Sequence, residues 1–241
     1  MVQTEALVIG CIKYGDSSLI AHLFTRELGY RSYLLKGILS SKKGKIKPSY
    51  FQPLTQLSVV VSDKNPDQLG YIRDLSMLHS PLHRPSDEIK TALQLFLCEL
   101  LGSVLRGETD QNTILFEYLA TTLQGLDAIP SLANFHIKFL LDMTKYLGFY
   151  PNTTHDEGDY FDIEAGVFCP LRPSGKHCYG APVQLLRQFL CMNFDAALAI
   201  ALTKNQRSEI LDTILVYYSF HIEGFYSPKS LSVLHEVFEM Y

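Results

Sequence analysis

A short basic segment holds the side chains best suited to contact a charged ligand. Between residues 26 and 47 there are seven Lys and Arg residues and one acidic residue, Glu27, for a local charge of +6. Cations neutralise phosphates and flat rings stack on bases, so a basic segment interleaved with Tyr and Phe is typical of surfaces that bind single strands. The predicted DNA contacts are Arg31, Lys36, Gly37, Lys42, Lys43, Lys45 and Lys47.

Two simpler interpretations of this segment stay open. A solvated Lys-rich loop that keeps the protein in solution would have the same composition. Taken individually, each ring near the basic residues is expected in a hydrophobic core rather than on a base-stacking platform. The rings concerned are Tyr30, Tyr33, Tyr50 and Phe51. Gly37 and Gly44 would let backbone N–H groups approach a phosphate closely.

Two other polar segments could suggest catalysis. Ser17 and Ser18 have no recognisable base, and turn chemistry explains the whole segment from Tyr14 to Ser18. The acidic segment 155–162 could hold a hard metal ion in a hydrolase, but its irregular composition favours a solvated loop. No phosphate-binding G-x-x-x-x-G-K-[ST] loop occurs. We therefore expect a protein without enzymatic activity.

The residues around the basic segment have the composition of β-strands. Apolar runs rich in β-branched and aromatic residues are separated by Gly, Asp, Asn and Pro. Five short strands without an intervening helix longer than a turn or two predict a small closed or half-closed barrel, and the OB-fold has this strand count. The expected strands are 6–14, 18–25, 30–36, 56–61 and 71–78.

After residue 80 the apolar spacing becomes helical. From Ile89 to Leu105 the apolar residues recur at three- and four-residue intervals, with Ser86 as N-cap and Gly107 past the end. We expect an α+β protein: a five-stranded OB-fold barrel in residues 1–80 and an all-α domain in 81–241 with an irregular insertion at about 150–181. The further helices are expected at 111–123, 131–147, 182–191, 194–202, 208–221 and 228–238.

The composition is that of a folded, water-soluble protein. Of the 241 residues, 47% are hydrophobic and 12% aromatic, which excludes wholesale disorder. No apolar run approaches the roughly 18 residues of a membrane span, and no basic segment followed by an apolar one opens the chain. Five cysteines, an odd number, favour reduced thiols. We expect a cytoplasmic protein that contacts no membrane.

The net charge of −4 hides two parts of opposite sign. Residues 1–80 carry ten basic and six acidic side chains, a net +4, whereas residues 81–241 carry eleven and nineteen, a net −8. A polyanion would be repelled by the average charge but attracted by the first part. This division predicts that DNA binds the barrel and that proteins bind the helical domain.

Several N-terminal segments resemble the RecO family of bacterial recombination mediators in order and spacing. The family pattern is an apolar strand, a Tyr-Gly-Asp/Glu-Ser turn, a strand ending in Phe-Thr, and a strand that closes on a basic residue and Gly. The matching segments are Glu5–Gly10, Tyr14–Ser18, Leu23–Thr25, Lys36–Gly37 and Phe51–Leu54, with a weaker likeness at Gly148–Pro151.

The resemblance implies an OB-fold followed by a helical domain, and a mediator that binds and anneals single-stranded DNA. In that role the protein would help exchange the single-strand-binding protein SSB for RecA in recombinational DNA repair, in partnership with RecR, within the cytoplasmic nucleoid. A protein-interaction adaptor that binds no DNA is the alternative. The two differ in salt dependence, because only DNA binding should weaken steeply with salt.

The resemblance also implies a groove in the helical domain for the acidic C-terminal tail of SSB. Such a groove needs an apolar pocket rimmed by Lys or Arg, and Lys138 and Lys145 are the predicted rim residues. They fall at i and i+7 with Asp142 between them, which an ordinary solvent-exposed stripe would show equally well.

Many members of the family carry a zinc site of two C-x-x-C pairs in the insertion. Here that region offers only Cys169 and Cys178, each without a partner two residues away, together with His155 and His177. The adjacent pair His177-Cys178 is poorly spaced for one tetrahedral ion. We expect no cofactor and no zinc, with Cys169 and Cys178 as the only, weak, metal candidates.

Overall fold

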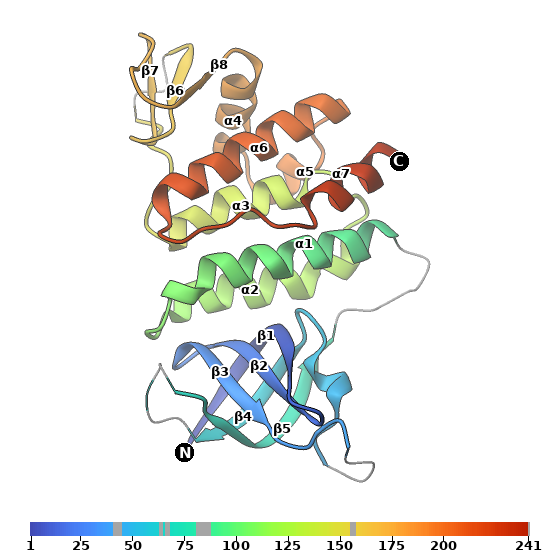
Figure 1. Cartoon of the computed structure of the whole chain (residues 1–241). Helices are drawn as coiled ribbons and strands as arrows, with labels where there is room; N and C mark the ends of the chain where they lie inside the picture. Colours follow the sequence, from blue (N-terminus) through green and yellow to red (C-terminus); the bar gives the residue numbers. More distant parts are fainter. Residues whose placement is uncertain (41–44, 63–64, 66–67, 81–87, 155–157, 241) are drawn as a thin grey trace. The chain divides into compact units, whose positions relative to one another are not determined.

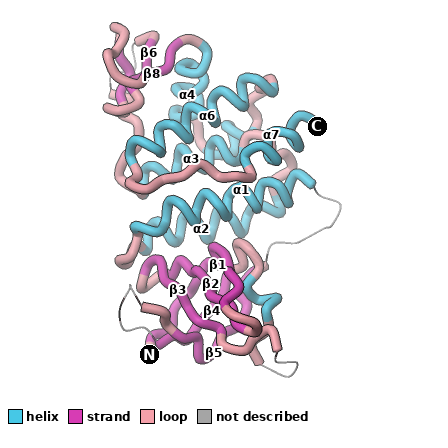
Figure 2. Tube along the Cα trace, viewed as in Figure 1, coloured by secondary structure: helices cyan, strands magenta, loops and turns pink. Residues whose placement is uncertain are grey.

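A computed structural model describes the whole chain except residues 41–44, 63–64, 66–67, 81–87, 155–157 and 241 (Figure 1). The chain forms two compact units, residues 1–128 with 228–230, and residues 129–227 with 231–241. Strands dominate the start of the first unit and helices the second (Figure 2). None of the helices in the described part of the chain is long and apolar enough to span a membrane.

The first unit begins with a five-stranded sheet of β1 (Val2–Tyr14), β2 (Ser18–Thr25), β3 (Gly29–Leu35), β4 (Gln56–Ser62) and β5 (Tyr71–His79). The strand order is β3-β2-β1-β4-β5, with antiparallel neighbours. Backbone bonds of 2.9 Å from Leu34 N to Gly70 O and from Gly70 N to Ser32 O join β3 to the start of β5. This closure confirms the predicted OB-type barrel.

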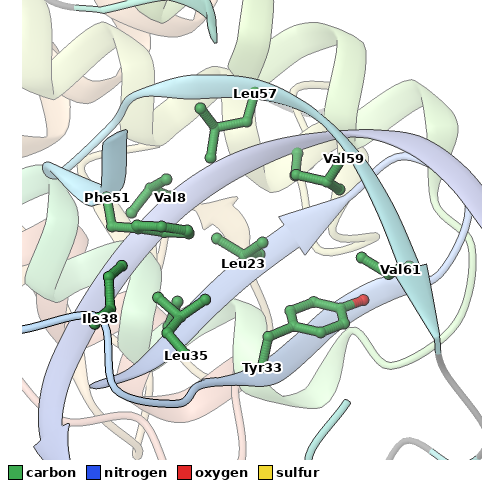
Figure 3. Packing of buried hydrophobic residues seen from close by; sticks show 11 residues of the cluster. Val8, Leu23, Tyr33, Leu35, Ile38, Phe51, Leu57, Val59 and Val61 are labelled. Carbon is green, nitrogen blue, oxygen red and sulfur yellow. The ribbon is translucent and has the colours of Figure 1, made fainter. Parts of the chain in front are cut away.

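Side chains of alternating strand positions fill the barrel. The inward set includes Leu23, Tyr33, Leu57 and Val59, which are fully buried and converge in Figure 3. A Cβ at Gly70 would lie 2.7 Å from the Tyr33 ring, so only glycine allows β5 to approach β3 at the closure point.

Two helices cover one side of the barrel within the first unit: α1 (Glu88–Val104) and α2 (Thr113–Gly125) (Figure 1). The ring of Phe24 packs on Phe116 at 6.1 Å, and Gln56 Nε2 donates to Ala120 O at 2.7 Å. The Cys98 thiol donates to Ile9 O. These two helices were expected in the helical domain, whereas by packing they belong with the barrel. The predicted N-cap of α1, Ser86, lies outside the described residues.

The second unit is a helical bundle with a small sheet. Its helices are α3 (Phe135–Tyr146), α4 (Ala181–Cys191), α5 (Phe194–Leu198), α6 (Lys204–His221) and α7 (Leu231–Met240). The expected insertion forms a three-stranded sheet of β6 (Tyr160–Asp162), β7 (Val167–Cys169) and β8 (His177–Tyr179).

Helix α6 begins four residues before the expected position. Thr203 accepts a hydrogen bond from Gln206 N, and the Gln206 side chain accepts from Thr203 N, which together make a capping box. The first turn is polar and therefore lacks the apolar spacing on which the prediction depended.

Candidate functional site

Three cations of the first unit surround one pocket on the barrel. Lys36 follows β3, Lys45 lies in the β3–β4 connection, and Arg73 lies in β5. The pocket has a volume of about 280 Å³, and its remaining lining is Leu34, Leu35, Gly37, Ile38, Ile46 and Ile72. A cationic rim around aliphatic walls therefore lies beside the point where β3 and β5 close the barrel.

The predicted lysines differ in their surroundings. Lys36 and Lys47 are exposed and make no ion pair with any residue that the structure describes. Lys45 Nζ lies 2.8 Å from Asp74 Oδ1, and this bond lowers the pKa of Asp74. Lys42 and Lys43 lie outside the described residues. Exposed ammonium groups without an ion-pair partner can exchange their counterions for phosphate most readily, because no ion pair has to break first.

Gly37 shapes the pocket rim but offers no backbone donor, which corrects the predicted role of its N–H. Its φ of +67° is readily adopted only by glycine, so it turns the chain after β3. Its N–H already donates to Ser18 Oγ at 3.1 Å.

Arg31 is not a surface residue, contrary to the expectation of a DNA contact. The residue is 8% exposed, and Nη1 donates to Thr109 O at 2.7 Å and to Tyr30 O at 2.9 Å. The odd-numbered residues of β3 all point to buried positions, and Arg31 is one of them. It joins β3 to the turn between α1 and α2, beside Gly29, where a Cβ would collide with the carbonyl oxygens of Glu108 and Asp110.

Most rings near the basic residues pack inside the barrel, as the hydrophobic-core interpretation of the sequence expected, and Tyr50 packs partly buried against the core. Tyr33 and Phe51 belong to the barrel core, and Tyr30 stacks on His22. Two other tyrosines are exposed on the barrel, Tyr14 at 54% and Tyr71 at 48%. Tyr14 pairs with Ser18, the residue that accepts the Gly37 N–H, and Tyr71 precedes two pocket residues. Tyr14 and Tyr71 come from separate strands, so a search within one short basic segment of the sequence does not find them.

In the second unit, Lys138 is buried, which corrects its expected place on a groove rim. The side chain is 2% exposed, and Nζ lies 3.0 Å from Asp142 Oδ1 and 3.1 Å from Phe189 O. Lys145 is partly exposed and lies 2.8 Å from the same carboxylate oxygen. Lys138 is thus an internal tie between α3 and α4.

A cation-rimmed apolar pocket does exist in this unit, between α3, α6 and α7. It has a volume of about 100 Å³ and is lined by His136, Lys204, Asn205, Arg207, Ser208, Leu211, Leu234, His235 and Phe238. The Arg207 guanidinium lies 5.7 Å from the centroid of the Phe238 ring, and desolvation lowers its pKa. Desolvation, and then the nearby charges of Arg207 and His235, lower the pKa of His136 to about 3.

Cys169 and Cys178 are on opposite faces of the small sheet. Cys169 pairs with Tyr160 and Cys178 pairs with Phe161, and adjacent residues of β6 point to opposite sides. Their thiols therefore do not converge on one ion. Within the described ranges, no group of three His, Cys, Asp or Glu residues could hold a metal. Part of the acidic segment, residues 155–157, lies outside those ranges.

An OB-type barrel with a clustered cationic surface, continuing into a helical bundle, defines the architectural class of this protein. Residues 1–81 match the family model described as Recombination protein O N terminal, and residues 85–231 match Recombination protein O C terminal. Along the sequence, the boundary between the two family matches falls where strands give way to helices. The first compact unit extends further, to residue 128.

Full-length relatives give the same result. The chain is 38% identical over 238 residues to a DNA repair protein RecO of Christiangramia forsetii, and the aligned region covers 99% of each chain. It is 36% identical to that of Flavobacterium psychrophilum, covering 98% of this chain and 99% of the relative. For Bacteroides fragilis the identity is 33%, with the same coverage. The chain belongs to the RecO family of DNA repair proteins.

Proposed function

We propose that this protein is a non-enzymatic, cytoplasmic mediator that binds and anneals single-stranded DNA. With RecR it would help RecA replace SSB on the strand, near the nucleoid. Membership of a DNA repair family supports the general role. The observation that carries the DNA-binding part is the convergence of Lys36, Lys45 and Arg73 around one pocket of the barrel.

Annealing requires two strands to approach despite phosphate repulsion while their bases stay free to pair. Exposed ammonium and guanidinium groups neutralise phosphates without covering Watson–Crick edges. Lys36, Lys47 and Arg73 are exposed in this way. Bringing strands together by charge neutralisation breaks no covalent bond, which is why a mediator of this kind needs no catalytic residue.

The salt dependence of binding separates this proposal from an adaptor that binds only proteins. If about four phosphates are neutralised, log affinity should fall with log salt at a slope of about −3 for a single strand. A rise from 50 to 200 mM salt should then weaken binding about sixtyfold. An adaptor binding through apolar surfaces should change little.

The test is a matched pair of charge-reversal variants in fluorescence anisotropy with a single-stranded oligonucleotide. Lys36→Glu/Lys47→Glu/Arg73→Glu reverses the charge of three exposed cations on the barrel. Arg172→Glu/Lys176→Glu/Lys229→Glu makes the same change in net charge at exposed positions outside it. We expect the first variant to lose at least a hundredfold in affinity and the second less than fivefold. Equal losses in both would contradict a localised site.

We also propose that the SSB tail binds the pocket between α3, α6 and α7 rather than a groove beside Lys138. The pocket meets the requirement for an acidic, apolar peptide, because Leu211, Leu234 and Phe238 offer apolar contact and Arg207 a cation. Its volume of about 100 Å³ suits one terminal side chain and its carboxylate.

A labelled peptide with the SSB tail sequence tests this placement. Lys204→Glu should weaken the peptide at least tenfold, because it reverses a charge on the pocket lining. Lys145→Glu, at the position expected from the sequence, should change the affinity less than twofold. If Lys145→Glu weakened peptide binding more than Lys204→Glu did, the tail would instead bind beside Lys145 on α3.

A further inference from the structure

The barrel pocket has two kinds of lining, and these suit different parts of a nucleotide. Its inner wall is aliphatic: Leu35 and Ile38 are buried, and Ile46 and Ile72 are half-buried. Its rim carries Lys36, Lys45 and Arg73. A phosphate needs cations in contact with water, whereas the face of a base gains by leaving water for an apolar wall.

Arg73 reaches this rim through an irregularity in the sheet. Val61 pairs with Ile72 and Val60 pairs with Asp74, so Arg73 is the extra residue of a β-bulge. Bulges change the direction of a side chain and frequently occur near binding sites. The bulge allows Ile72 and Arg73, neighbours in sequence, to line the same pocket.

The dimensions of the pocket limit what it can hold. At about 280 Å³ it lies just below the usual range for small-ligand pockets, roughly 300–1,000 Å³. This space suits one flat ring system rather than several. The aliphatic side chains on its wall have no donors or acceptors with which to read the edge of a base.

We infer that this pocket binds one unstacked base of a single strand, with its wall formed by Ile46 and Ile72, while Lys36 and Arg73 contact the adjoining phosphates. The inference rests on the proposed single-strand binding and deepens it. A duplex keeps its bases stacked and paired, so it could fill the pocket only after one base is unpaired and unstacked, which opposes binding. The pocket therefore gives preference for single strands without preference among bases.

A comparison of normal and abasic strands separates base binding from phosphate binding. The affinity of the full chain is measured for a thymidine oligonucleotide and for a strand of equal length made of abasic residues. Wild type should bind the thymidine strand about tenfold or more tightly. Ile46→Ser should reduce that ratio at least threefold while leaving the abasic affinity unchanged.

The matched control is Ile114→Ser, the same substitution at a residue 67% exposed on α2 and outside the pocket lining. Ile72→Ser repeats the test from β5 if the first variant does not fold. A ratio that changes less than threefold in the folded pocket variants overturns the inference. Equal affinity of the wild-type protein for the thymidine and abasic strands would also overturn the inference, although the proposed single-strand binding would stand. Absence of binding to either strand would overturn the proposed function as well.

Discussion

Basic side chains have opposite surroundings on the barrel surface and inside the helical unit. Lys36, Lys47 and Arg73 are exposed, with no ion-pair partner in the described part of the chain, whereas Lys138 is held by Asp142 and Phe189 O. A buried cation whose donors are occupied stabilises its own fold and cannot be offered to a ligand without breaking those bonds. A hydrated, unpaired cation can exchange its counterions for phosphate. The same residue type thus serves folding in one region and binding in the other.

The sharpest test of this difference is the removal of Lys138. Lys138→Ala leaves Phe189 O without its donor and Asp142 with only Lys145. We expect the free energy of unfolding to fall by about 3 kcal/mol, measured by urea denaturation followed by circular dichroism. Lys145→Ala, which removes the partly exposed partner, should cost less than about 1 kcal/mol. Equal effects of the two variants would show that burial does not distinguish them.

Arg31 should behave like Lys138, although it lies in the basic segment of the barrel. Arg31→Ala removes bonds from a charged group to Thr109 O and Tyr30 O, which should cost about 2 kcal/mol in unfolding free energy. Affinity for single-stranded DNA should stay within twofold once both proteins are compared in the folded state. A large loss of DNA affinity with unchanged stability would place Arg31 among the binding residues after all.

A buried histidine adds a pH dependence to the helical unit. His136 has a pKa near 3 when folded and an ordinary value of 6.5 when unfolded. Protons therefore bind the unfolded chain first, and the stabilisation present above pH 6.5 is lost as the pH falls toward 3. Between pH 6 and pH 5 this site should lower the unfolding free energy by up to about 1.4 kcal/mol. Denaturation of His136→Gln at both pH values should show a flatter dependence than wild type; parallel curves would contradict this assignment.

The barrel was predictable because local pattern and tertiary structure agree. The five expected strands match β1 to β5 to within a few residues, since alternating apolar positions and glycine turns each allow only one arrangement. The division between strands and helices at residue 80 was also visible. The sequence did not indicate that α1 and α2 pack on the barrel, because an amphipathic helix does not identify the surface that it covers.

The candidate sites were harder to predict, because exposure depends on the fold. For Arg31 a signal was present: it has the same strand parity as Tyr33 and Leu35, both of which are buried. For Arg73 no such signal existed. It is remote in sequence from Lys36, and only barrel closure and a bulge bring the two together. Lys138 was misplaced because the helical spacing shows one apolar face, whereas α3 is buried on nearly all sides.

The smallest predicted effect is that of Lys47, and it measures directly what one exposed cation contributes to DNA binding. Lys47→Gln removes one hydrated cation that has no ion pair within the described residues. Unfolding free energy should change by less than about 0.5 kcal/mol, as for most surface substitutions. Affinity for a single strand should fall a few fold, and the slope of log affinity against log salt should become shallower by about 0.7, the value for one lost phosphate contact. Lys176→Gln, exposed on the loop before β8, is the matched control and should leave that slope unchanged. If Lys47→Gln left the slope unchanged too, Lys47 would be a solvated residue of the loop, and the binding surface would contract to Lys36, Lys45 and Arg73.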